Sequence, residues 1–239
     1  MEEPHAAGKT GLLSRDFLPE FVYGGIDGAI TTFAVVAGAT GASFDIPVVI
    51  VLGFANLIAD GFSMSVGNFF SSKASVDAYE KHKATEHWEI DNLRETEVEE
   101  IREIYRKKGF EGELLEQVVA VITSNKEVWV DTMMKEELEL SKDQKSPYQT
   151  AGMTFFSFLL IGFIPLAAYV FALIFDTSKD NLFLYACILT GVALSIIGVL
   201  KSTVNNKNVL QGVAETLFLG GIAAILAYFA GDFLENLFR

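Results

Sequence analysis

The chain divides into long apolar runs and one long polar segment, and this pattern predicts its elements. Charge-poor runs cover residues 28–44, 148–175, 181–200 and 209–231. Most of them approach or exceed the roughly 20 residues that a helix needs to cross the hydrocarbon of a membrane. With a second span that begins near Ile46, they predict five membrane helices. A water-soluble core does not need apolar runs of this length, so the pattern predicts an all-α membrane protein.

The polar segment, residues 73–147, is also predicted to be helical. No proline lies between Pro47 and Pro147, so the second span can continue as one helix to about residue 90. Thr96 followed by Glu99 matches a capping box, which predicts a helix from residue 96 to residue 107, just before Gly109. Two further helices are predicted over 113–123 and 126–140. Four helical pieces within about 70 residues predict a compact bundle inserted between spans 2 and 3.

The predicted elements group into four regions. In chain order these are an N-terminal arm (1–16), spans 1 and 2 (17–72), an acidic helical domain (73–147) and spans 3 to 5 (148–239). Outside the acidic domain, the basic residues of one membrane side outnumber those of the other: Lys9, Arg15, Lys201 and Lys207 against Lys179 and Arg239. The positive-inside rule therefore predicts that the N-terminus and the acidic domain are cytosolic.

Asp27 is a charged residue inside the first predicted span, 17–42. A charge near the centre of a membrane helix costs about 3 kcal/mol on insertion scales, so such a residue normally faces a bundle interior or a water-filled path. The neighbouring glycines allow a second interpretation, in which Asp27 lies near the interface and the glycines permit close helix packing. We favour a role for Asp27 in an ion path.

A polar stripe runs along the second predicted span. Asn56, Asp60, Met64 and Asn68 recur every four residues and so share one face of the helix. Such a face is hard to explain as lipid-facing, although Met64 alone would be typical of core packing. Near the start of the last span, Glu215 fits either a position at the membrane interface or a role with protons or ions.

Acidic side chains cluster at helical spacing within the polar segment. Glu86 with Glu89, Glu97 with Glu100, and Met133 and Met134 with Glu137 lie three or four residues apart. Carboxylates at this spacing repel one another unless a cation lies between them, and the two thioethers add soft ligands that favour a transition metal. Two simpler interpretations remain: glutamates are favoured in a first helical turn without any metal, and the methionines could be core residues.

The composition narrows the possible partners. The formal charge of −13 argues against nucleic-acid binding through a basic surface and suits a protein that handles cations. The single cysteine, Cys187, excludes a disulfide within one chain. Residues 1–16 are polar and lack the apolar region of a signal peptide, so the first span is expected to stay in the mature protein. This short N-terminus favours a prokaryotic plasma membrane over a vacuolar one.

With these motifs assembled, the chain resembles the vacuolar iron transporter family from residue 21 to residue 231. The resemblance is carried by the glutamate-rich insert and by three motifs: Gly-Gly-Ile-Asp27-Gly, Asp-Gly-Phe-Ser-Met64 and Asp131-Thr-Met-Met-Lys-Glu-Glu137. Two positions depart from the pattern of many members, which have glutamate where this chain has Asn68 and a small residue where it has Asp60.

The resemblance implies a transporter rather than an enzyme. It implies a homodimer in the lipid bilayer that exports Fe²⁺ from the cytosol in exchange for protons, through a pore at the subunit interface. In such a protein Asp27 and Met64 would line the transport path. The glutamates and methionines of the acidic domain would bind the metal: Glu86, Glu89, Glu97, Glu100, Met133, Met134 and Glu137.

Other functions remain open at the level of sequence. Glu-x-x-Glu pairs on a bundle could form a di-iron ferroxidase, although no Glu-x-x-His pair is apparent. The acidic domain could also be a sensor without transport. The transported ion could be Mn²⁺, Co²⁺ or Zn²⁺, because neighbouring divalent metals accept similar ligands. Asp60, Asn68 and Glu215 are candidates for additional polar positions along the path.

Overall fold

A computed structural model describes residues 17–141, 145–175 and 181–238, which form nine helices and no strand. The all-α prediction is therefore confirmed for the described part of the chain. The predicted N-terminal arm lies outside the described residues, as do Lys179 and Arg239. The chain splits into two compact units. We call them the apolar unit, which runs up to Phe69 and resumes at Ser146, and the acidic unit, which is Phe70–Lys145.

The apolar unit contains the candidate membrane spans. Four helices are long and apolar enough to cross a membrane: α1 (Leu18–Gly41), α2 (Ile46–Asn92), α8 (Leu182–Val204) and α9 (Val209–Phe238). A fifth span results if the bent pair α6 (Pro147–Gly162) and α7 (Ile164–Phe175) crosses as one. These assignments rest on length and composition.

The bend between α6 and α7 is 51°. The sequence explains its position, because Pro165 has no N–H to donate to the preceding turn and its ring clashes with the backbone there. The chain remains hydrogen bonded around the break, with the Phe163 N–H donating to the Leu159 carbonyl at 3.0 Å. Pro165 therefore accounts for the kink between the two helices.

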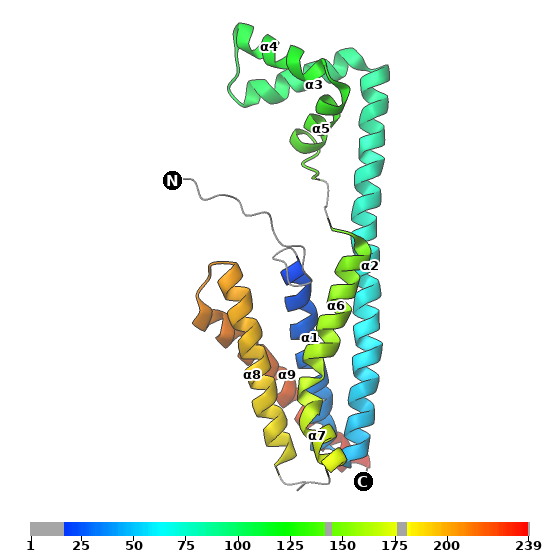
Figure 1. The fold of residues 1–239 in the computed structure, drawn as a ribbon, viewed down its shortest axis with the longest axis vertical. Helices are drawn as coiled ribbons and strands as arrows, with labels where there is room; N and C mark the ends of the chain where they lie inside the picture. The colour runs from blue at the N-terminus through cyan, green and yellow to red at the C-terminus, as the bar shows by residue number, and fades with distance from the viewer. Residues whose placement is uncertain (1–16, 142–144, 176–180, 239) are drawn as a thin grey trace. The chain divides into compact units, whose positions relative to one another are not determined.

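Helix α1 is the central helix of the apolar unit, and it packs against α6, α7, α8 and α9 (Figure 1). Its contact with α6 is close because glycines lie on the shared face. A Cβ atom added to Gly28 would lie 2.5 Å from the Phe158 carbonyl oxygen, and one added to Gly24 would lie 2.5 Å from the Thr154 carbonyl oxygen. The glycines that flank Asp27 therefore do permit close helix packing.

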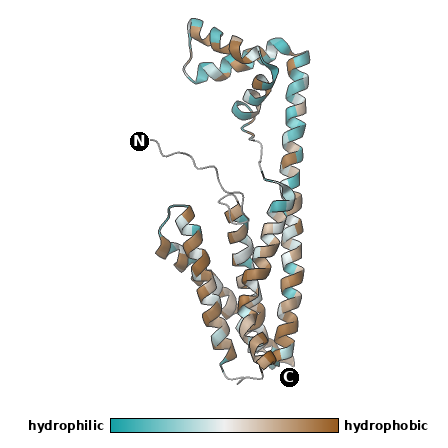
Figure 2. Cartoon of the chain, in the orientation of Figure 1, coloured by the Kyte–Doolittle hydropathy of each residue, from teal (hydrophilic) through white to brown (hydrophobic). Residues whose placement is uncertain are grey.

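The acidic unit is a bundle with its own apolar core. It is built from the C-terminal part of α2, α3 (Arg94–Lys107), α4 (Gly112–Thr123) and α5 (Lys126–Glu136). Trp129, Ile101, Met133 and Met134 are fully buried in its core. Hydrophilic residues dominate the helices of this unit and hydrophobic residues those of the apolar unit (Figure 2).

Ion pairs link the surfaces of the helices in the acidic unit. Arg102 of α3 pairs with Glu116 of α4 at 2.8 Å and also with Glu99. Lys126 of α5 pairs with Asp91 near the end of α2 at 2.5 Å. Exposed pairs of this kind contribute little stability each, so the buried apolar core has the larger effect on the folding of this unit.

Two helix boundaries in the acidic unit differ from the prediction. The capping box at Thr96 was wrong: α3 begins at Arg94, and Leu93 occupies the N-cap position without a side-chain hydrogen bond. The Leu93 carbonyl accepts instead from the backbone N–H groups of Thr96 and Glu97. Helix α5 ends at Glu136 and not at residue 140, because Glu139 has a φ of 53°, which breaks the helical path.

The remaining boundaries agree closely with the prediction. Helix α2 continues without a break to Asn92, as the absence of proline indicated. Helix α3 ends at Lys107, and Gly109 follows with a φ of +94°, a conformation that glycine adopts without strain. Helix α4 begins one residue before the predicted start, at Gly112.

Candidate metal sites

The polar stripe on α2 faces neighbouring helices. The Asn56 amide donates to the hydroxyls of Thr31 and Thr32 on α1, at 3.5 Å each, and the Asn68 amide donates to the Thr154 hydroxyl on α6 at 2.6 Å. Two of these three threonines, Thr32 and Thr154, are completely buried. The two ends of the stripe are therefore bound to α1 and α6.

Met64 lies between the two asparagines of the stripe. It is half-buried and packs against the apolar core of the unit. Its neighbour Ser65 donates to the Ala151 carbonyl of α6 at 3.0 Å. The Met64 thioether is therefore held in a helix face that contacts protein, which agrees with either a core role or a ligand role.

Asp27 and Asp60 are brought close together by α1 and α2. Each is half-buried, and the two carboxylates are near enough for electrostatic repulsion between them. The sequence predicted a role for Asp27 but did not predict which acidic residue would lie beside it. Two carboxylates in apolar helices are costly unless protons or a cation offset their charge.

Glu215 is bound in a different kind of contact. Its carboxylate accepts from Lys201 Nζ of α8 at 2.9 Å and from the Gln211 amide of its own helix at 3.2 Å. Glu215 and Lys201 are partly solvent-accessible. The charge of Glu215 is thus offset by a lysine, as expected for a carboxylate near a membrane interface.

In the acidic unit, Glu86 of α2 and Glu97 of α3 are the most buried of the predicted carboxylate ligands, each with 4% of its surface exposed. Burial, together with the carboxylates of Glu137, Glu89 and Glu100, raises the pKa of Glu86 to about 7. Burial and the charges of Glu100, Glu86, Glu89 and Glu137 raise the pKa of Glu97 to about 7 as well. These five carboxylates from three elements therefore form one electrostatic cluster, which we call the glutamate cluster.

Two further members of the glutamate cluster, Glu100 and Glu137, also have a raised pKa. Loss of solvent and the charges of Glu137 and Glu89 raise the pKa of Glu100. Loss of solvent and the charge of Glu89 raise the pKa of Glu137, which lies at the C-terminal cap of α5. A raised carboxyl pKa means that the folded protein disfavours the accumulated negative charge and favours protons or cations among these groups.

Two oxygen atoms of the glutamate cluster have no partner. Glu86 Oε2 and Glu97 Oε2 are both buried and neither forms a hydrogen bond. A buried acceptor without a donor is costly, and the cost is larger when the group is charged. The cluster therefore holds unsatisfied acceptors that a proton or a metal cation would satisfy.

The cluster is a loose arrangement. Among the described residues, no three His, Cys, Asp or Glu side chains lie close enough together to surround one metal ion. Electrostatic repulsion acts over a longer distance than coordination, so both findings hold together. Coordination of an ion by several of these carboxylates would require their flexible side chains to change rotamers.

Met133 and Met134 lie in the apolar core of the acidic unit, and neither side chain is exposed. Their neighbours in the core include Ile90, one turn after Glu86, and Ile101, one turn after Glu97. The two thioethers are thus buried near the elements that carry the buried glutamates. This position is the core role that the sequence had left open.

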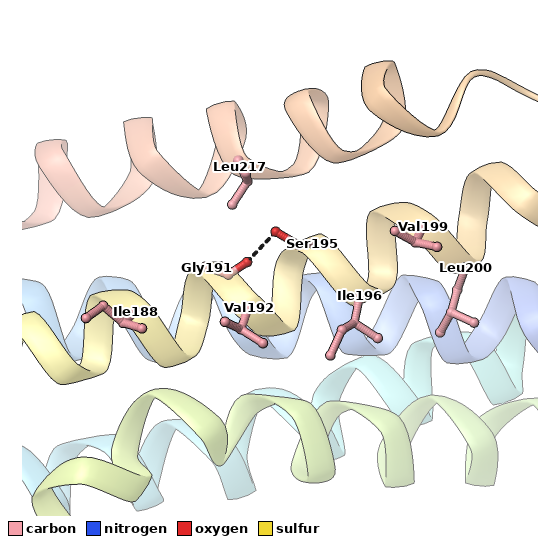
Figure 3. Close-up of a pocket in the computed structure, with 8 residues that line it drawn as sticks. All are labelled: Ile188, Gly191, Val192, Ser195, Ile196, Val199, Leu200 and Leu217. Atoms are coloured by element: carbon pink, nitrogen blue, oxygen red, sulfur yellow. Dashed lines mark hydrogen bonds between the residues drawn. The ribbon is translucent and has the colours of Figure 1, made fainter.

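An apolar pocket of about 550 Å³ lies on α8 and α9 (Figure 3). Its lining side chains are aliphatic apart from Ser195, whose hydroxyl donates to the Gly191 carbonyl of its own helix at 2.7 Å. Leu217 contributes from α9 and the other labelled residues from α8. The lining offers no carboxylate, thioether or imidazole, so this pocket is unsuited to metal ions.

Comparison with known protein families shows to which family the chain belongs. The sequence profile of the VIT family matches residues 18–232, from the start of α1 into the C-terminal part of α9. The chain belongs to the VIT family. The resemblance that the motifs indicated is therefore confirmed, and the match includes both units of this VIT family protein.

Several curated relatives are similar to this VIT family chain over most of its length. The Vacuolar iron transporter of Toxoplasma gondii is 34% identical over 93% of this chain and 76% of the relative. That of Plasmodium falciparum is 33% identical over 96% of this chain and 86% of the relative. Vacuolar iron transporter 1 of Arabidopsis thaliana is 31% identical over 89% and 84%, respectively. These names describe transporters and not enzymes, which agrees with the prediction of a non-enzymatic protein.

Several polar partners in this VIT family protein were not predicted from the sequence. Thr31, Thr32 and Thr154 were not singled out, although each accepts a hydrogen bond from an asparagine of the stripe. A hydroxyl inside an apolar span is a recognisable signal, because Ser and Thr side chains form hydrogen bonds between membrane helices. The pairing itself depends on the packing of the helices and is not visible in the sequence.

Proposed function

We propose that this VIT family protein transports a divalent transition metal, with Fe²⁺ as the first candidate, out of the cytosol in exchange for protons. The observation that supports this most strongly is the approach of Asp27 and Asp60 on adjacent apolar helices, beside the thioether of Met64 on the same stripe. The names of the relatives point to iron as the transported ion. Mn²⁺, Co²⁺ and Zn²⁺ are the closest alternatives, since their ligand preferences overlap.

The membrane step of the proposal uses the two aspartates as alternating carriers. When a cation lies between α1 and α2, its charge offsets the carboxylates of Asp27 and Asp60, and Met64 adds a soft ligand that disfavours Mg²⁺. When the cation has left, protons offset the same charge. One pair of groups that holds either a metal ion or protons gives antiport, because the empty, unprotonated state is the costly one.

The acidic unit has the role of collecting metal ions. Glu86 and Glu97 supply buried carboxylates, and Glu89, Glu100 and Glu137 add negative charge around them. Entry of a cation would displace protons from groups whose pKa is raised to about 7, so binding is coupled to proton release. Met133 and Met134 would act as ligands only after a side-chain rearrangement that turns their sulfur atoms from the core toward the cluster.

The proposal includes an orientation and an assembly. The acidic unit and the N-terminus face the cytosol, as the distribution of basic residues indicates, and the membrane is a prokaryotic plasma membrane. Two copies of the chain form the transporter. Asp27 of the two copies then faces a shared path at the subunit interface.

The experiment that tests the proposal is uptake of metal into proteoliposomes that hold the purified protein under an imposed pH gradient. Fe²⁺, Mn²⁺, Zn²⁺ and Mg²⁺ are offered outside in turn. Fe²⁺ uptake that requires an acidic lumen supports proton-coupled transport, and the order of rates identifies the preferred ion. Oxygen consumption on addition of Fe²⁺ without uptake would favour a ferroxidase, and metal binding without either activity would favour a sensor.

A further inference from the structure

The contact between Asn68 of α2 and Thr154 of α6 has a defined direction. The Asn68 Nδ2 atom donates to Thr154 Oγ1 at 2.6 Å, and the Thr154 hydroxyl donates in turn to the Thr150 carbonyl of its own helix at 3.0 Å. Thr154 is completely buried. Because its single proton is used within α6 in this arrangement, the Thr154 oxygen acts as the acceptor for the donor from α2.

The contact lies one helical turn after Met64. Asn68 and Met64 are four residues apart on the same face of α2, and Ser65 donates to the Ala151 carbonyl of α6 at 3.0 Å. Two side chains of α2 are therefore hydrogen bonded to α6 within one turn of the thioether. Met64 itself packs against the apolar core, and within the described part of the chain it forms no comparable polar contact that would fix its position.

An amide side chain can donate this hydrogen bond to Thr154 whether the ionisable groups of the transport path are protonated or not. An ionised carboxylate has no proton to donate, so it could bond to Thr154 only if the Thr154 hydroxyl gave up its bond to the Thr150 carbonyl. A neutral carboxyl could donate, but only while it is protonated. The Asn68 amide does not titrate, so the contact with Thr154 is independent of the passage of protons.

We propose that Asn68 is a positioning residue which anchors α2 to α6 through Thr154, so that Met64 keeps its place while protons and metal ions pass. Asn68 is then not a member of the proton route, and it binds no ion itself. The effect of this contact on the transport rate rests on the proposed transport function. The contact itself can be tested without transport.

The test must distinguish loss of the Asn68–Thr154 contact from pH effects that arise when other ionisable groups gain or lose protons. Ionisable residues on the elements packed around this contact are unchanged in all variants: Glu20, Tyr23 and Asp27 of α1, Asp60 of α2 and Tyr148 of α6. Rates are therefore expressed relative to the wild type at each pH, under the same imposed gradient. Ser195→Ala is the matched control for loss of a hydroxyl in a membrane helix, because Ser195 bonds only within α8 in the contacts described above.

Uptake of Fe²⁺ by the full-length protein in proteoliposomes is the measurement. N68A and T154V are each expected to lower the maximal rate by about three- to twenty-fold, which corresponds to the measured range for interhelical hydrogen bonds in a membrane protein. The KM for the metal should stay unchanged, and the double variant should be no slower than either single variant. T154S, which keeps the acceptor oxygen, should recover most of the rate.

N68D provides the decisive pH profile. Its rate relative to the wild type should be low at pH 7.5 and should rise as the pH falls and the new carboxyl gains a proton to donate. In the T154V background this rise should disappear, because the acceptor is missing. A constant ratio of N68D to wild type, a rise that persists in T154V, an unchanged rate in N68A, or a change in KM alone would each overturn the proposal.

Failure of the proposed transport function has a different signature. If the wild type moves no metal, the anchor is judged by thermal unfolding of the same variants in detergent. Non-additive shifts for N68A and T154V support the contact, and additive shifts overturn it.

Discussion

Glu86 and Glu97 place a carboxylate oxygen in the interior of the acidic unit without a hydrogen-bond partner. The pKa of each is raised to about 7, first by burial and then by neighbouring carboxylates. A divalent cation would offset this charge and also supply the missing partner. The two residues are therefore the members of the glutamate cluster whose properties differ most from those of ordinary surface glutamates.

The first prediction concerns the pH dependence of metal binding. Below about pH 7 a metal ion must displace protons from Glu86 and Glu97, so the apparent affinity should fall as the pH decreases from about 7.5 to 5.5. Isothermal titration with Mn²⁺ or Fe²⁺ in buffers of different ionisation enthalpy measures both the affinity and the protons released. Binding that releases no protons at pH 6.5 would contradict a role for these two groups.

The second prediction concerns stability without metal. Because the folded-state pKa of Glu86 and Glu97 lies above the ordinary value of 4.5, the contribution of these two groups to stability is greatest below about pH 4.5 and is lost as the pH rises toward 7. The loss should amount to a few kcal/mol in total, since one pKa unit corresponds to about 1.4 kcal/mol. The double variant E86Q/E97Q should remove most of this loss at pH 8 and should also weaken metal binding.

Tryptophan fluorescence measures this effect selectively. Both tryptophans of the chain, Trp88 and Trp129, lie in the acidic unit, and Trp129 is fully buried. The matched control is E116Q, because Glu116 is exposed and paired with Arg102, a contact that lowers the pKa of Glu116. Equal thermal shifts for E116Q and E86Q/E97Q would show that burial of the two glutamates has no special effect.

At the scale of elements, the contact between α1 and α6 determines where Asp27 lies. Gly24 and Gly28 bring α1 against the backbone of α6, one turn before Asp27 and directly after it in the sequence. A methyl group at Gly28 would lie 2.5 Å from the Phe158 carbonyl oxygen, which is backbone and cannot move aside as a flexible side chain would. The helices would have to separate.

The third prediction is that G28A destabilises the apolar unit by about 1–3 kcal/mol, the usual cost of overpacking, and lowers the transport rate. Thermal unfolding in detergent and metal uptake measure the two effects. G221A is the matched control, because nothing lies within 4 Å of a Cβ at Gly221 in α9. A thermal midpoint for G28A equal to that of G221A would contradict the close packing of α1 and α6.

The elements show how far sequence reasoning extends. The continuous course of α2 to Asn92 and the bend before Pro165 followed from the positions of prolines, which act locally through the backbone. The start of α3 did not follow from Thr96, because α2 runs to Asn92 and only Leu93 separates it from α3, so that Thr96 already lies inside the helix. Local signals are reliable only where no alternative backbone contact competes.

The candidate sites show the same limit. The spacing of Asn56, Asp60, Met64 and Asn68 indicated one helix face, and that face does contact protein through both of its asparagines. Neither the approach of Asp60 to Asp27 nor the pairing of Asn68 with Thr154 could be predicted, because both depend on the register between helices. The burial of Met133 and Met134 in the core was one of two possibilities that periodicity cannot separate.

At the scale of the whole molecule, the VIT family match covers both units, so the metal-collecting role and the transport role that we propose concern a single family protein. The fourth prediction is that the functional assembly contains two chains of 26.2 kDa each. Light scattering in detergent, corrected for bound detergent, measures the protein mass. A protein mass of one chain in a preparation that transports metal at full rate would contradict a path at a subunit interface.

The most direct test of the account is Fe²⁺ uptake by Asp27→Asn in proteoliposomes under an imposed pH gradient. The substitution keeps the shape of the side chain and removes the charge that attracts the cation and exchanges protons. We expect uptake at the background level, with metal binding to the acidic unit unchanged in the same preparation. Uptake at the wild-type rate would contradict the proposed transport path, because the path would then not involve Asp27.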